Sequence, residues 1–308
     1  VIVVENTFYM NWIIVTVFAA FFQNLRSGIQ KNLNKEISLV ASTYVRFIFC
    51  LPFAFLLYIL YFQGFDVFHE TLQQKNFLLF ILLASIAQIF FTFLLLYSFQ
   101  FSNFIVGTTL SKTEVVQIAI LETLILHDTF NFWTIIGIII STIGVLVFST
   151  KNKDMIIKNL SSKSTMVGLA CGFLLASSVT FYRAATLSLV NLDSKFEMAL
   201  STLFIGVLIQ SIILTIYLLY FEKSEFRKMY QNKFQCIAAG FCGFVTTLSW
   251  FYAFTLVQAA IVRAVGQIEL LFSYIASRYY FKEKIKFIEV IGILIFAIGV
   301  MIILFAKK

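Results

Sequence analysis

The sequence predicts an all-α integral membrane protein of ten transmembrane helices, arranged as two inverted five-helix repeats. Three observations support this fold class. Hydrophobic residues make up 60% of the chain and charged residues 12%, with a mean hydropathy of +0.93, whereas a soluble domain carries about 25% charged residues. The apolar runs have the length of about 20 residues that a helix needs to cross a bilayer. Finally, a segment from the middle of the chain returns near its end.

The internal repeat is clearest in two apolar segments. Seven of the ten residues in 136–145 are identical in 291–300, at an offset of 155 residues. The same offset places Glu114 on Glu269, far upstream of the repeated segment. A duplicated apolar half is typical of transporters.

Apolar runs between polar breaks predict the individual spans. These are residues 11–30, 38–62, 76–99, 104–126, 132–149, 165–190, 197–221, 234–255, 260–280 and 287–306. The runs are continuous rather than alternating, which favours helices over a β-barrel. Pro52 predicts a kink within the second span.

The spans divide into a first repeat, residues 11–149, and a second, residues 165–306. Because five is an odd number, the second repeat enters the membrane from the side opposite to the first. Inverted repeats of this kind enclose a cavity near the midplane, which rocking of the halves exposes to each side in turn.

Charged residues inside the spans are the candidate functional groups, since one at the bilayer centre costs roughly 2.5–3.5 kcal/mol or more. Glu114 and Glu269 occupy the same repeat position at mid-span. They either bind a cationic group or exchange a proton during transport, or they form structural ion pairs and hydrogen bonds with neighbouring helices.

Arg26 lies on one helical face with Gln23 and Gln30, and Arg183 is its counterpart when the sixth span is laid over the first. Both arginines either face the cavity or extend to the membrane interface. The predicted substrate-binding residues are Gln23, Arg26, Tyr97, Glu114, Arg183, Trp250, Tyr252, Arg263, Gln267 and Glu269. We interpret Arg46, Lys112 and Arg278 as interface or packing charges.

Enzyme activity is disfavoured by the motifs. The sequence has no phosphate-binding GxxxxGK[ST] loop, no HExxH and no GxSxG. We therefore expect no catalytic residues, no metal site and no cofactor. The glycine pairs Gly137/Gly144 and Gly292/Gly299 predict close helix packing, within the chain or in a dimer.

The chain resembles EamA-type members of the drug/metabolite transporter superfamily. The resemblance lies in two five-span halves that each close on an acidic residue, a short loop, Ile-Gly, six intervening residues and Gly-Val. The most specific stretch is Phe281-Lys282-Glu283-Lys284 with Ile291-Gly292 and Ile298-Gly299-Val300. Such members commonly have a proline near the positions of Val115 and Leu270, and this chain has none.

The resemblance implies a secondary transporter that works without ATP. We expect it to move a small polar or zwitterionic, amino-acid-like metabolite by alternating access, with a proton as the candidate coupling ion. The alternatives are a multidrug exporter of lipophilic cations and, from another class, a membrane scaffold or sensor that transports nothing.

The expected partners are a small-molecule substrate and membrane lipid, not nucleic acid, and the protein is a monomer or a homodimer. The expected location is the inner cell membrane, with many passes. The orientation stays open: most loop lysines and arginines lie opposite the termini, which predicts external termini, whereas the resemblance implies cytoplasmic ones.

Overall fold

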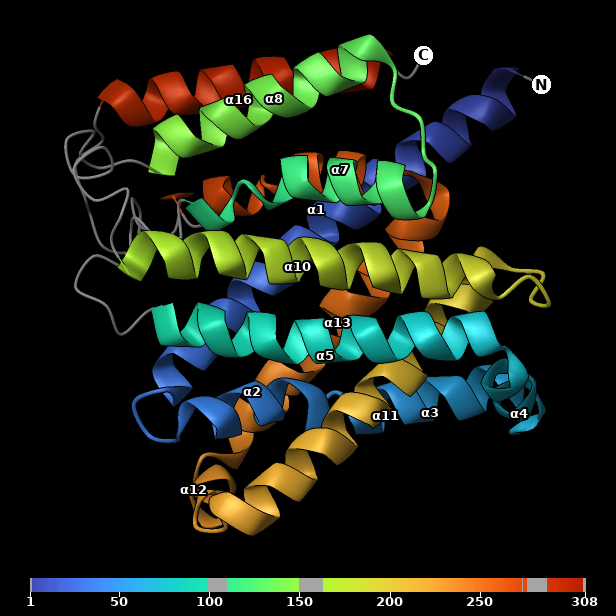
Figure 1. Ribbon diagram of the computed structural model, residues 1–308, viewed down its shortest axis with the longest axis vertical. Helices are drawn as coiled ribbons and strands as arrows, with labels where there is room; N and C mark the ends of the chain where they lie inside the picture. The colour runs from blue at the N-terminus through green and yellow to red at the C-terminus, as the bar shows by residue number, and fades with distance from the viewer. Residues whose placement is uncertain (1, 99–109, 150–162, 273, 276–286, 307–308) are drawn as a thin grey trace.

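The computed structural model of the protein describes residues 2–98, 110–149, 163–272, 274–275 and 287–306, which contain helices and no strand (Figure 1). The helices are α1 (Ile2–Leu33), α2 (Leu39–Ile48), α3 (Leu51–Phe62), α4 (Asp66–Gln73), α5 (Lys75–Ser98), α7 (Glu114–Ile125), α8 (Phe132–Ser149), α10 (Lys163–Ser188), α11 (Lys195–Phe221), α12 (Glu225–Gln231), α13 (Lys233–Leu256), α14 (Ala259–Gly266) and α16 (Phe287–Ala306).

Eight helical segments of the described chain are long and apolar enough to cross a membrane. They are Asn11–Leu33, Leu39–Phe62, Lys75–Ser98, Phe132–Ser149, Thr165–Ser188, Lys195–Phe221, Lys233–Leu256 and Ile288–Ala306. The predicted spans 104–126 and 260–280 are not among them, and each extends beyond the described residues. The all-helical membrane fold is therefore confirmed, but the number of ten spans is not.

The fourth and ninth predicted spans are interrupted at the same repeat position. The helical pattern breaks at residues 112–113, just before Glu114, and at residues 267–268, just before Glu269. At both breaks a backbone N–H bonds three residues back: Thr113 to Leu110 and Ile268 to Val265, each at 3.1 Å. Two discontinuous helices thus form without a proline at either break.

Pro52 marks a third break, as the sequence predicts. α2 ends at Ile48 and α3 begins at Leu51, with Pro52 in the first turn of α3. Proline fits a first turn because its missing N–H has no intrahelical partner there.

The helices of the two halves pack crosswise. α1 packs against α13, and its counterpart α10 packs against α5, so the first span of each half contacts the third span of the other. Figure 1 shows α10 and α5 side by side across the centre of the molecule. Short helices α4 and α12, which the span prediction did not include, follow the second span of each half.

α8 and α16 form a close antiparallel pair at the upper edge of Figure 1. A Cβ atom on Gly137 would lie 2.9 Å from the carbonyl oxygen of Gly299, and one on Gly144 would lie 2.9 Å from that of Gly292. The glycines therefore let the two backbones touch. They meet within the chain, as one of the two sequence interpretations expected.

Candidate functional site

A cavity of about 290 Å³ lies between helices of both halves. This volume is near the lower end of the range of about 300–1,000 Å³ for small-molecule sites. The lining residues are Gln23, Asn24, Arg26, Ser27, Arg46, Gln88, Phe91, Leu95, Ser111, Lys112, Glu114, Leu175, Val179, Tyr182, Thr247, Trp250, Phe251, Phe254, Arg263, Glu269 and Leu270.

Glu114 is fixed in the cavity wall by groups from the other half of the chain. Arg263 of α14 forms a salt bridge with its carboxylate, and the Gln267 amide donates a hydrogen bond to the same oxygen at 3.1 Å. Glu114 is 2% exposed. A buried carboxylate needs such partners, since an unpaired one costs several kcal/mol or more.

Glu269 is held in the same way from the first half. Lys112 forms a salt bridge with one carboxylate oxygen, and the Gln23 amide donates to the other. The Gln23 carbonyl in turn accepts a hydrogen bond from the Trp250 indole N–H at 3.0 Å. Because Trp250 also lies under the Arg263 guanidinium, 4.7 Å from Cζ to the ring centre, the two acidic sites share one network.

Arg26 differs from the other charged groups of the cavity. It is 4% exposed, and its Nε and Nη1 atoms are buried without a hydrogen-bond partner. The structure gives no salt bridge between Arg26 and any described carboxylate. A buried guanidinium in this condition is costly, and it lines the cavity.

Arg46 and Lys112 correct the sequence interpretation, which treated both as interface or packing charges. Arg46 is 6% exposed, lines the cavity and donates to the Thr92 hydroxyl at 2.8 Å. Lys112 lines the cavity beside Glu269. Arg278 lies outside the described residues.

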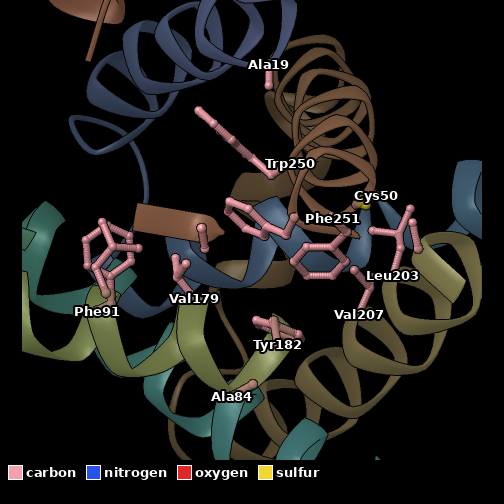
Figure 2. Close-up of a cluster of buried hydrophobic side chains, with 14 of the residues drawn as sticks. Ala19, Cys50, Ala84, Phe91, Val179, Tyr182, Leu203, Val207, Trp250 and Phe251 are labelled. Atoms are coloured by element: carbon pink, nitrogen blue, oxygen red, sulfur yellow. The ribbon is translucent and has the colours of Figure 1, made fainter. Parts of the chain in front are cut away.

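Aromatic and aliphatic side chains form the rest of the cavity wall. In Figure 2, Trp250 and Phe251 of α13 lie above Val179 and Tyr182 of α10, and Phe91 lies beside Val179. The Phe251 and Tyr182 rings pack with centres 4.6 Å apart. The apolar part of the wall comes mainly from α5, α10 and α13, whereas the charged part comes from α1, α2 and the two broken spans.

Four predicted site residues do not line the cavity. Gln267 lies behind it, bonded to Glu114. Tyr97 is 37% exposed and stacks on Phe93, and Tyr252 packs against Phe196. Periodicity places these residues on a helix but does not show which neighbouring helix covers the face.

Arg183, the fourth, lies in a separate cluster formed by α7, α10, α13 and α14. Its Nη1 donates to Glu122 at 2.8 Å and also to Asp128, and its Nε donates to the Phe254 carbonyl at 3.1 Å. The Glu122 carboxylate is fully buried and accepts the N–H groups of Ala259 and Ala260 at the start of α14. We call these residues the Arg183 cluster.

The remaining predicted residues, Gln23, Arg26, Glu114, Trp250, Arg263 and Glu269, line the cavity. The lining groups that sequence reasoning missed include Asn24, Ser27, Arg46 and Lys112. Asn24 donates to the backbone carbonyl of Glu269 at 3.0 Å. A signal existed for Arg46 and for Asn24, since a charged and a polar residue each lie inside an apolar run.

An all-helical chain with many membrane-spanning segments and a polar cavity between two related halves defines a multi-pass membrane transporter. The model of the EamA-like transporter family matches residues 10–150 and again residues 164–305. The chain therefore belongs to the EamA-like transporter family, as the resemblance indicated, and is a membrane transporter of the drug/metabolite superfamily.

Two further comparisons complete this picture. No curated protein matches the chain. A crystal structure whose title names no function superposes with a TM-score of 0.68 at 10% sequence identity, covering 98% of this chain and 98% of its own. At this identity the likeness shows the fold alone.

Proposed function

We propose that the protein is a secondary active transporter of the inner cell membrane that moves a small polar metabolite by alternating access. The proposal includes ten spans in two inverted halves. One observation carries it: the cavity between the halves is lined by ionisable side chains from both of them, on the broken spans and on α1 and α2. Discontinuous helices in corresponding positions of two repeats are typical of transporter binding sites.

The Arg183 cluster supports a mechanism for alternating access. It ties α10, α7 and the α13–α14 junction together near the end of α10, and Phe254, whose carbonyl Arg183 binds, borders the cavity. In this mechanism the cluster holds that end of the bundle closed, and its separation opens the cavity to the corresponding side of the membrane. Glu114 and Glu269 are the candidate groups for coupling to protons.

The charge of the cavity bears on the alternative functions. Its lining includes four cationic residues and two carboxylates, and each carboxylate has a cationic partner. This balance disfavours an exporter of lipophilic cations, which would need an uncompensated carboxylate in the cavity. A scaffold without transport does not need a buried guanidinium facing a cavity.

Flux into proteoliposomes tests the proposal. Vesicles with the purified protein would receive a defined mixture of amino acids, organic acids and one lipophilic cation, with a pH gradient, a membrane potential or neither. We expect accumulation of at least one polar solute above that in protein-free vesicles. The Arg26→Met variant should lose this flux, while Tyr217→Phe on the outer face of α11 should keep it. No protein-dependent flux of any solute would favour the scaffold.

A further inference from the structure

We propose that the substrate is a carboxylate with an apolar body, recognised through its anionic group at Arg26 and without any contribution from an amino group. This inference rests on the proposed transport function and narrows its substrate class. It starts from the one cationic group of the described cavity lining that has neither a carboxylate nor a hydroxyl partner. Lys112 has Glu269, Arg263 has Glu114, and Arg46 has Thr92.

The burial of Arg26 points to a ligand. Its Nε and Nη1 atoms are hidden from solvent and bond to no other group. Removing a guanidinium from water without replacing its hydrogen bonds costs free energy, and an incoming oxyanion recovers that cost. A carboxylate fits best, since its two oxygens match the planar guanidinium in a pair of charge-assisted hydrogen bonds.

The same geometry argues against recognition of an ammonium group. Glu114 is bound by Arg263 and Gln267, and Glu269 by Lys112 and Gln23. An incoming ammonium would have to displace an arginine or a lysine from a carboxylate. The number of ion pairs would then stay the same, because one pair would break for each that formed. With four cations to two carboxylates in the lining, an extra positive charge is unfavourable and a negative one is favourable.

The rest of the wall sets the shape of the ligand. Phe91, Leu175, Val179, Phe251 and Phe254 present apolar surface to the cavity, and Figure 2 shows several of them converging from three helices. A ligand that places its carboxylate at Arg26 would bury an apolar group against this surface, which favours binding. A small hydrophilic dicarboxylate would leave that surface unfilled.

Three probes of one size test the inference. They are 3-phenylpropionate, phenylalanine and phenethylamine, which carry the carboxylate alone, both groups and the amine alone. Binding would be followed in low-chloride buffer by thermal shift and by tryptophan fluorescence, since Trp250 borders the cavity. We expect 3-phenylpropionate to bind at least as tightly as phenylalanine, and phenethylamine not to bind. Tighter binding of phenethylamine or phenylalanine than of 3-phenylpropionate overturns the inference.

Matched variants assign the binding to Arg26. Arg26→Met should weaken the binding of 3-phenylpropionate by about tenfold or more, which is the loss expected for hydrogen bonds to a charged group. Arg26→Lys should recover part of it, and Tyr217→Phe should bind like the unmodified protein. Equal binding by Arg26→Met and the unmodified protein overturns the inference, and the melting temperature of each variant shows that it is folded.

Separate measurements of binding and of transport distinguish failure of the substrate inference from failure of the proposed transport function. If 3-phenylpropionate binds through Arg26 and no solute crosses the membrane, the substrate inference stands as ligand recognition and the transport function fails. If a cation or a neutral solute is transported while none of the carboxylates binds, the transport function stands and the inference is wrong.

Discussion

Arg183 donates a hydrogen bond to the carboxylate of Glu122 at 2.8 Å, whereas the equivalent arginine of the first half, Arg26, has no partner for its Nε and Nη1 atoms. The two arginines, which correspond when the sixth span is laid over the first, therefore differ in pairing: Arg183 forms salt bridges, and Arg26 forms none with any described carboxylate.

The first prediction compares the stability of two matched variants without ligand. Arg26→Met removes an unpaired buried charge and should leave the melting temperature unchanged or higher. Arg183→Met leaves the buried Glu122 and its neighbour Asp128 without their cation, so it should destabilise by roughly 3–5 kcal/mol. Differential scanning fluorimetry in detergent measures both. Similar losses in the two variants would contradict the difference in pairing.

The second prediction concerns proton coupling. Glu114→Gln and Glu269→Gln keep the shape of the side chain and remove its charge. We expect at least one of them to abolish transport driven by a pH gradient in proteoliposomes while the protein stays folded. If both variants transport at the unmodified rate with the same pH dependence, the carboxylates only hold Arg263 and Lys112 in place and the coupling proposal fails.

The third prediction tests whether the Arg183 cluster closes one end of the cavity. Asp128→Asn weakens the cluster but leaves Arg183 its bond to Glu122. In a cysteine-free background, Thr255→Cys, one residue beyond the Phe254 carbonyl that Arg183 binds, should then react several times faster with a membrane-impermeant maleimide. The control is the same cysteine with Asp128 intact. An unchanged rate would mean that this end does not open when the cluster weakens.

The fourth prediction concerns the contact between α8 and α16. Gly144→Ala places a methyl group against the backbone of α16 at Phe296 and Gly292, so it should lower the melting temperature by forcing the helices apart. Gly28→Ala is the control, because nothing lies within 4 Å of the added atom. There alanine should stabilise α1, by up to about 1 kcal/mol. Equal effects at both positions would show that the contact is not tight.

The sequence predicts the membrane class and the repeat because both depend on local hydrophobicity and on an offset in the chain. It predicts Pro52 as a break for the same local reason. The breaks at 112–113 and 267–268 escape prediction because no proline or glycine cluster marks them. Each break is followed by a glutamate that binds a cation from the opposite half, and no local pattern shows such a tertiary contact.

The sequence identifies only part of the cavity lining, because it shows which residues are charged but not which helices are neighbours. Charges inside apolar runs identify Arg26, Glu114 and Glu269, since such groups must avoid lipid. The presence of a charge in an apolar run does not show whether the residue faces the cavity or forms an ion pair elsewhere, as Arg183 does. That distinction depends on which helices of the two halves are neighbours, and the crosswise packing of α1 on α13 and α10 on α5 lies beyond any single-segment pattern.

Glu122 also has a consequence for how the protein is made. The N-cap residue of α14, Gln258, offers no side-chain acceptor to its own helix, and the acceptor instead comes from a carboxylate 137 residues earlier in the chain. The first turn of α14 is therefore completed only when the nascent second half docks on a first half already in the membrane. A fragment that contains only the first half has Glu122 but not α14. A fragment that contains only the second half has α14 without the carboxylate that caps it. Folding of the second half is in this way tied to the presence of the first.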